Sequence, residues 1–201
     1  MITKNQAKVM EIFTGHITEE FSMREIALLI KKDTSLTRRA ILPLIKDGYL
    51  NKTKKRNLIL NNKHNQQTLA YVENLRSKEF LEKPKNKSIS RFTNDVMQKI
   101  KEDSFVLIIF GSAVEKGNPR DIDVLLIIKD LKDVEINEGI LSRIAENYPS
   151  IKFDYHVISF ESVYEMLAKR DQKNVMNEIL NKHLIIHGAD LFYRLLEKGR
   201  M

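Results

Sequence analysis

Two aspartates near the middle of the chain have the spacing of a metal site. Asp121 and Asp123 begin an apolar segment that reads DIDVLLII over residues 121–128. Side chains alternate along a β-strand, so both carboxylates point to the same side. Two neighbouring like charges on an apolar strand are unfavourable unless a cation neutralises them. Because Mg²⁺ binds through a few carboxylates together with substrate phosphates, the pattern predicts a Mg²⁺ site.

A third carboxylate and a glycine–serine turn extend this candidate site. Residues 151–158 alternate between apolar and polar, with Asp154 on the polar side. If the two strands are neighbours, three carboxylates converge and can hold two metal ions for in-line displacement at a nucleoside triphosphate. Gly111-Ser112 follows the apolar strand 105–110. The glycine allows the backbone to approach a phosphate, and the serine hydroxyl can donate a hydrogen bond to it.

The spacer between Ser112 and Asp121 carries two further candidates for phosphate contact, Lys116 and Arg120. The alternative for both is that they are solvated loop cations. Asp121 and Asp123 could likewise be surface residues at the end of a strand. We favour the metal site, because the pair follows an apolar strand that ends in glycine and serine. The chain has no Gly-x-x-x-x-Gly-Lys-Ser/Thr pattern, which argues against a P-loop NTPase.

The stretch IFGSAVEKGNPRDIDVLLI, followed later by FDYHV, resembles the nucleotidyltransferase superfamily with the DNA polymerase β-like fold, specifically its minimal members. The resemblance covers about residues 88–190. It implies that Asp121, Asp123 and Asp154 are metal-binding catalytic carboxylates and that Gly111 and Ser112 bind the triphosphate. The implied reaction is Mg²⁺-dependent transfer of a nucleoside monophosphate from an NTP, such as ATP, to an acceptor hydroxyl.

The first 62 residues have the order of three short helices followed by a basic hairpin. Residues 4–14 carry apolar side chains at helical spacing, and Ser22-x-x-Glu25 fits a capping box at the start of a second helix. A third helix is expected from about Thr34 to Asp47-Gly48, with Leu36 among its inward residues and Pro43 in its interior. This order resembles the winged helix-turn-helix family over about residues 3–62.

A winged helix would bind nucleic acid through its third helix and its wing. The face of the third helix that we expect to be exposed and to enter a major groove carries Ser35, Thr37, Arg38 and Arg39. The basic wing carries Lys54, Lys55 and Arg56, which are expected to hold phosphates. The alternative is a winged helix that docks a protein and whose charges are solvated.

The charge distribution favours the nucleic-acid interpretation. Of the 201 residues, 34 are Lys or Arg and 27 are Asp or Glu, a net charge of +7. Residues 1–87 hold 18 basic and 9 acidic side chains, whereas residues 88–201 hold 16 and 18, so the whole basic excess lies in the first part.

The chain has no cysteine, which excludes disulfides, thiolate zinc sites and thiol catalysis. Its apolar runs are too short to span a bilayer, and no signal peptide is visible, so we expect a cytoplasmic protein without membrane contact.

These patterns predict an α+β chain of three parts. They are a winged helix-turn-helix (1–62), a connecting helix and linker (63–87) and an α/β nucleotidyltransferase domain with a short mixed sheet flanked by helices (88–201). The connecting helix is expected to serve as a spacer or as a homodimer seam. Two alternatives to the enzyme stay open: a DNA-binding regulator whose second domain senses a nucleotide, and an antitoxin-like protein whose second domain modifies or docks a partner protein.

Overall fold

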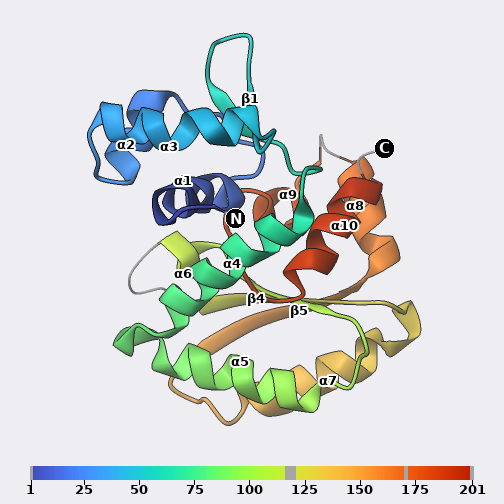
Figure 1. Ribbon diagram of the computed structural model, residues 1–201. Coiled ribbons are helices and arrows are strands. Elements are labelled where there is room, and N and C mark those ends of the chain that lie inside the picture. The colour runs from blue at the N-terminus through green and yellow to red at the C-terminus, as the bar shows by residue number, and fades with distance from the viewer. Residues whose placement is uncertain (1, 116–120, 170–171, 200–201) are drawn as a thin grey trace.

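The computed structural model describes residues 2–115, 121–169 and 172–199. The fold is mixed α+β, with a small mixed sheet flanked by helices on both faces (Figure 1). This confirms the expected fold class at that level. Lys116 and Arg120 lie outside the described residues.

The N-terminal part contains three helices and a two-stranded hairpin, in the predicted order. They are α1 (Lys4–Gly15), α2 (Met23–Leu29), α3 (Thr34–Lys46), β1 (Leu50–Lys52) and β2 (Leu58–Leu60). The capping box predicted at Ser22 and Glu25 is present at the start of α2. Pro43 lies within α3 and does not end it. β1 and β2 pair antiparallel, and Phe21 adds a single bridge to Leu58 beside them.

Two predictions about the faces of α3 are wrong. Leu36 was expected to point inward, but it is 42% exposed. Thr37 was expected on the exposed face, but it is buried, and its hydroxyl donates to the Asp33 carbonyl at 2.8 Å. The apolar positions that do face inward are Ala40, Ile41 and Leu44. The helix is therefore rotated relative to the expected register by its packing on α1 and α2, a contact that spacing alone does not specify.

The C-terminal part is a four-stranded sheet in the order β5-β4-β3-β6. The strands are β3 (Val106–Phe110), β4 (Asp121–Ile128), β5 (Lys152–Ser159) and β6 (His183–His187). β3 pairs antiparallel with both β4 and β6, whereas β4 and β5 are parallel. The helices of this part are α5 (Lys87–Lys99), α6 (Ser112–Glu115), α7 (Val134–Ala145), α8 (Phe160–Ala168), α9 (Val175–Ile179) and α10 (Ala189–Gly199). Two short 3₁₀ turns, η1 (Pro84–Asn86) and η2 (Leu131–Asp133), precede α5 and α7.

The helix α4 (Gln66–Leu81) is the predicted connecting helix, and it lies inside the molecule. Together with α8 and α10 it covers one face of the sheet, while α5 and α7 cover the other (Figure 1). Leu69 and Val72 of α4 belong to one continuous apolar cluster with Phe13 of α1 and Ile108 of β3. The helix therefore joins the N-terminal part to the sheet through a shared core.

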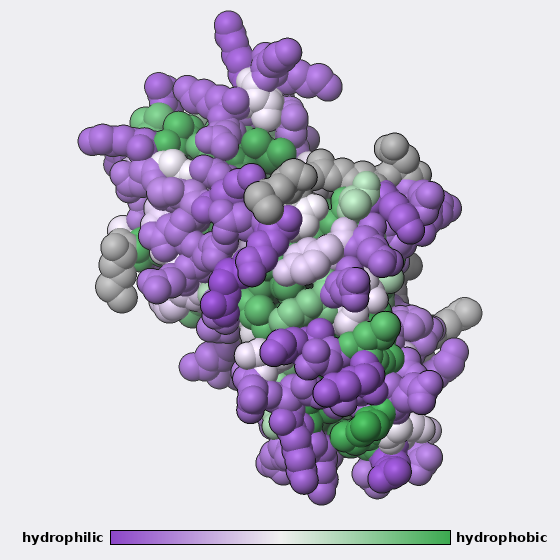
Figure 2. Space-filling model, turned by 90° about the vertical axis from the view of Figure 1, so that its right-hand side faces the viewer, coloured by the Kyte–Doolittle hydropathy of each residue, from purple (hydrophilic) through white to green (hydrophobic). Residues whose placement is uncertain are grey.

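One side of the molecule is mostly hydrophilic (Figure 2). Figure 2 shows the side of the molecule that is on the right in Figure 1, where the hairpin at the top is hydrophilic and the apolar areas are small and separated. None of the helices in the described ranges combines the length and the apolar character needed to cross a membrane.

Candidate functional site

The sheet register brings the three predicted carboxylates to one side of neighbouring strands. Asp123 of β4 lies directly opposite Asp154 of β5, and Asp121 lies opposite Lys152. Aligned residues of parallel strands point to the same face, so the three aspartates share that face at the start of β4. Asp121 and Asp123 are half-buried, whereas the side chain of Asp154 is 54% exposed. His156 lies on the same face, with its Nε2 atom 3.8 Å from Asp154 Oδ1.

The glycine–serine turn lies against the central aspartate. β3 ends at Phe110, which is opposite Asp123, and Gly111 then takes a left-handed backbone with φ of 66°. A Cβ atom on Gly111 would also overlap the Asp123 carboxylate. Both the left-handed backbone and this close contact therefore exclude a side chain at position 111. Ser112 begins α6 directly after this turn. Gly111, Ser112 and the three aspartates are thus gathered at one end of the sheet.

The charges at this end of the sheet repel one another. The pKa of Asp123 is raised above its usual range, first by burial and then by the negative charges of Asp121, Asp154 and Glu178; His156 opposes this only in part. A cation placed among the three aspartates would relieve this repulsion, and carboxylate oxygens are the donors that Mg²⁺ prefers. The residues therefore fit Mg²⁺ by donor chemistry and by register. In the described ranges, however, no group of three or more acidic or histidine side chains is close enough to enclose a metal ion.

A pocket of about 610 Å³ opens beside Asp123. Its opposite wall is α9 and the turn before it, which contribute Lys173, Asn174 and Glu178. Asn174 caps α9 by accepting from the Asn177 backbone N–H at 3.0 Å, and its amide donates to the Met166 carbonyl at 3.1 Å. The wall is therefore fixed by side-chain hydrogen bonds. The volume is in the range of small-molecule sites, which is large enough for a nucleotide.

Sequence reasoning did not identify Lys173, Asn174, Asn177 or Glu178 as pocket residues. The pattern Asn174-x-x-Asn177 is a capping signature and could have predicted the start of α9. It could not have placed this helix next to Asp123, because that contact depends on the return of the chain to the sheet through β6. His156, which lies on the face of Asp154, is also in the wall of the pocket.

The rear of the α9 wall rests on the N-terminal part. The Ile17 backbone N–H donates to the Leu180 carbonyl at 2.9 Å, and the Thr18 N–H donates to Asn181 Oδ1 at 2.9 Å. Asn181 in turn donates to the Thr18 hydroxyl at 2.6 Å. The segment after α1 therefore supports the segment that lines the pocket.

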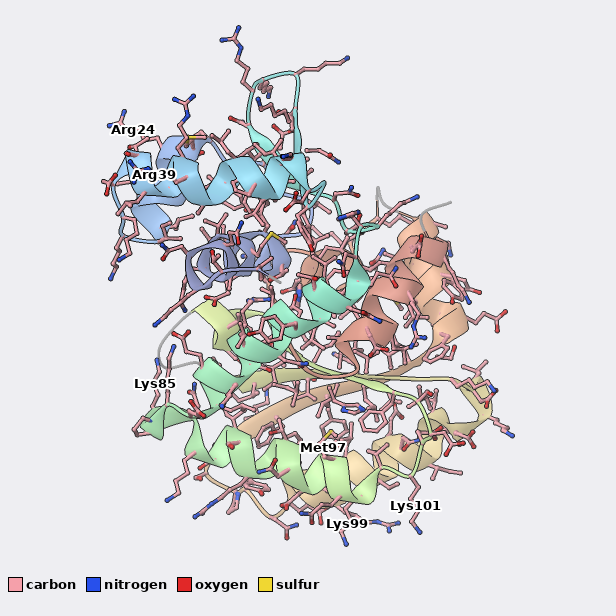
Figure 3. All side chains as sticks on the ribbon, in the orientation of Figure 1. Arg24, Arg39, Lys85, Met97, Lys99 and Lys101 are labelled. Carbon is pink, nitrogen blue, oxygen red and sulfur yellow. The ribbon has the colours of Figure 1, made fainter. Side chains whose placement is uncertain are left out.

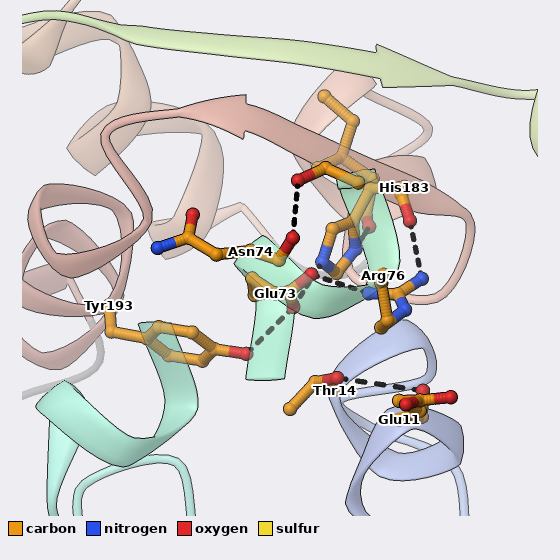
Figure 4. Close-up of polar contacts among 9 residues, drawn as sticks. Glu11, Thr14, Glu73, Asn74, Arg76, His183 and Tyr193 are labelled. Atoms are coloured by element: carbon orange, nitrogen blue, oxygen red, sulfur yellow. Dashed lines mark hydrogen bonds and ion pairs between the residues drawn. The ribbon is translucent and has the colours of Figure 1, made fainter. Parts of the chain in front are cut away.

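A buried ionic cluster holds β6 in place behind the site (Figure 4). Glu73 of α4 is fully buried and accepts hydrogen bonds from Arg76 at 2.5 Å and from the Tyr193 hydroxyl at 3.0 Å. His183 has Nε2 3.1 Å from Glu73 Oε1 and Nδ1 2.6 Å from the Ile179 carbonyl, so both ring nitrogens face acceptors. Arg76 also donates to the His183 carbonyl at 2.8 Å. Burial favours the neutral acid, but Arg76 and His183 outweigh it and hold the pKa of Glu73 below its usual range.

The predicted nucleic-acid residues lie on the N-terminal part, away from the pocket. Ser35, Arg38 and Arg39 are exposed and line a shallow groove of about 460 Å³ on α3 together with Leu42. Figure 3 shows Arg39, with Arg24 near it, at the end of the molecule opposite to Lys99 and Lys101. The hairpin tip carries the exposed side chains of Lys54, Lys55 and Arg56. Thr37 is buried and does not belong to this surface.

Comparisons of the chain with models of protein families, with curated proteins and with solved structures find no match.

Proposed function

We propose that the protein is a Mg²⁺-dependent nucleotidyltransferase. The observation that carries this proposal is the register that aligns Asp123 with Asp154, two residues from Asp121 and against the Gly111-Ser112 turn. The resemblance of this stretch to minimal nucleotidyltransferases supports it. We also propose that residues 88–201 have the nucleotidyltransferase fold and that residues 1–62 form a winged helix-turn-helix. The three helices and the basic hairpin of residues 1–62 support the second assignment.

The proposed chemistry assigns a role to each group. Asp121, Asp123 and Asp154 would hold Mg²⁺, which supplies neutralisation of phosphate charge and activation of the acceptor hydroxyl. Ser112 and the N–H groups of the turn donate hydrogen bonds to the phosphates of the NTP. The acceptor oxygen forms a bond to the α-phosphorus, the bond to pyrophosphate breaks, and Asp154 takes the hydroxyl proton. Its exposed carboxylate is open to an acceptor arriving from solvent.

Nucleotide binding and transfer test this proposal. Calorimetric titration with ATP, CTP, GTP and UTP, with and without Mg²⁺, should show Mg²⁺-dependent binding of at least one NTP. The Asp121→Asn/Asp123→Asn variant should lose that binding, and its transfer rate should fall about a thousandfold or more. Asp130→Asn is the matched control, because Asp130 is an exposed aspartate just beyond the other end of β4. Binding or transfer that survives in the double variant would overturn the proposal.

A second candidate function is a DNA-binding regulator that responds to nucleotide. It is favoured by the contact of Ile17 and Thr18 with Leu180 and Asn181, which joins the pocket wall to the N-terminal part. NTP binding without turnover, together with duplex DNA affinity that depends on Arg38 and Arg39, would select this function. Turnover of the bound NTP would select the enzyme.

A further inference from the structure

A second cleft of about 560 Å³ lies between the N-terminal part and the rest of the molecule. We call it the junction cleft. Its walls are α1 and the end of α2 on one side and α4 on the other, and its floor includes Val114 of α6 and Leu184 of β6. Val114 lies two residues after Ser112, so the floor of the junction cleft adjoins the turn of the candidate site. The proposed function does not use this cleft.

The junction cleft has a basic rim whose charges are only partly paired. Lys8 lies between the two acids of the cleft, with its Nζ 2.9 Å from Glu11 and 2.8 Å from Glu79. The Lys8 hydrogen bond and charge, and at longer range Lys83, lower the pKa of Glu79. Arg76 is paired with the buried Glu73. Lys31 and Lys83, from opposite walls, form no ion pair within the part of the chain that the structure describes. Two ammonium groups therefore lie at the rim of the cleft without a direct ion pair.

Apart from Gly15 and His16, the other lining residues are apolar or aromatic. Phe80 of α4 is half-buried in the wall beside Leu184 and Val114. Clefts that bind single-stranded nucleic acid combine cations along the backbone with an aromatic surface on which a base stacks. A volume of about 560 Å³ accommodates one or two nucleotides and not a duplex. The wall containing Lys31 belongs to residues 1–87, which carry the whole basic excess of the chain.

We propose that the junction cleft binds the end of a single-stranded nucleic acid and that this strand is the acceptor of the transferase. The phosphates contact Lys31 and Lys83, a base lies on Phe80, and the strand continues past α6 to present its terminal hydroxyl at Asp154. The assignment of the strand as acceptor rests on the proposed function. The binding itself does not, and the two parts are measured separately.

Fluorescence anisotropy of the full chain without Mg²⁺ tests the binding. The probes are a fluorescein-labelled single-stranded 12-mer, as DNA and as RNA, and a 20-base-pair duplex, each over 50–200 mM salt. The Lys31→Gln/Lys83→Gln variant should bind the single strand about tenfold more weakly, with a salt-dependence slope smaller by about 1.4, because each phosphate contact contributes about 0.7. Lys99→Gln/Lys101→Gln is the matched control, since these lysines lie at the far end of the molecule (Figure 3). Thermal unfolding checks that both variants are folded.

The outcomes separate this inference from the proposed function. Equal single-strand affinity in the two lysine variants would overturn the cleft assignment. Free AMP that binds the unmodified protein as tightly as the 12-mer does, and loses that binding in the Lys31→Gln/Lys83→Gln variant, would also overturn it, because the cleft would then be a mononucleotide site. If the cleft variant loses transfer to the strand but keeps Mg²⁺-dependent NTP binding, the acceptor assignment is supported. If the unmodified protein binds the strand but no NTP, the proposed transferase function is wrong, while the assignment of the cleft as a strand-binding site is supported.

Discussion

Gly111 combines a left-handed backbone with close approach to the Asp123 carboxylate. An alanine at this position would be strained by its φ and would displace Asp123. We therefore expect Gly111→Ala to lower the free energy of unfolding by about 1–2 kcal/mol. Transfer should fall about a hundredfold, because the carboxylate moves away from its partners. Gly139→Ala on α7 is the control, since a Cβ atom there meets nothing within 4 Å. Unchanged transfer in Gly111→Ala would show that Asp123 needs no fixed position.

Asp123 is also a source of instability when no metal is bound. Its raised pKa, caused first by burial and then by neighbouring carboxylates, means that folding disfavours its charged form. Asp123→Asn removes that charge, so the metal-free variant should melt about 1–2 °C higher, or about 0.5 kcal/mol after allowance for solvent screening. Calorimetry in EDTA at pH 7 measures this difference. A lower melting temperature would mean that the carboxylate stabilises the metal-free fold.

At the scale of elements, a buried charge on α4 fixes this helix to β6 and α10. Removing one partner of a buried ionic cluster leaves the other charges unpaired, and Glu73→Gln should therefore lower the free energy of unfolding by about 3–5 kcal/mol. Glu82→Gln, at the C-cap of the same helix, is the control, because Glu82 is 66% exposed and its carboxylate is as far as 3.9 Å from Lys78 Nζ. Its effect should stay below about 1 kcal/mol. Urea unfolding of both variants provides the measurement. Similar losses in both variants would show that the buried cluster contributes no more than a surface pair.

The same carboxylate predicts an acid dependence of stability. The pKa of Glu73 in the folded protein is below its ordinary value of 4.5, so its contribution is complete above about pH 4.5 and is lost as the pH falls through the lower folded value. The stability difference between the unmodified protein and Glu73→Gln should therefore be constant from pH 5 to 7 and shrink toward pH 3. A difference that grows on acidification would contradict this assignment.

The parts of the fold that follow from local patterns could be predicted from the sequence. The strands of Asp121 and Asp154 were visible from apolar runs and alternation, and the capping box located α2. Long-range contacts could not be predicted in this way. α9 reaches the pocket because β6 pairs with β3, and no local pattern in residues 172–180 specifies that pairing. The buried face of α3 differs from the predicted one for the same reason. Its orientation is set by packing on α1 and α2, so Leu36 is exposed and Thr37 is buried, with its hydroxyl donating to the Asp33 carbonyl.

At the scale of the whole molecule, one apolar cluster connects α1, α4 and the sheet. The chain should therefore unfold in a single calorimetric transition, although its sequence divides at residues 62 and 87. A fragment of residues 63–201 keeps α4 over the sheet and should fold with reduced stability. A fragment of residues 88–201 lacks α4 and leaves that face of the sheet uncovered, so it should bind a hydrophobic dye and show no cooperative melt. Two separate transitions in the full chain would contradict the shared core.

The buried cluster around Glu73 also has a consequence for synthesis on the ribosome. Its partners His183 and Tyr193 lie 110 and 120 residues further along the chain. At about 5–20 residues per second, α4 exists for about 6–24 s before the last of these partners has been made. Throughout that interval the apolar side of the helix that later covers the sheet has nothing to pack against. A nascent chain stalled in this window should be the form that chaperones bind.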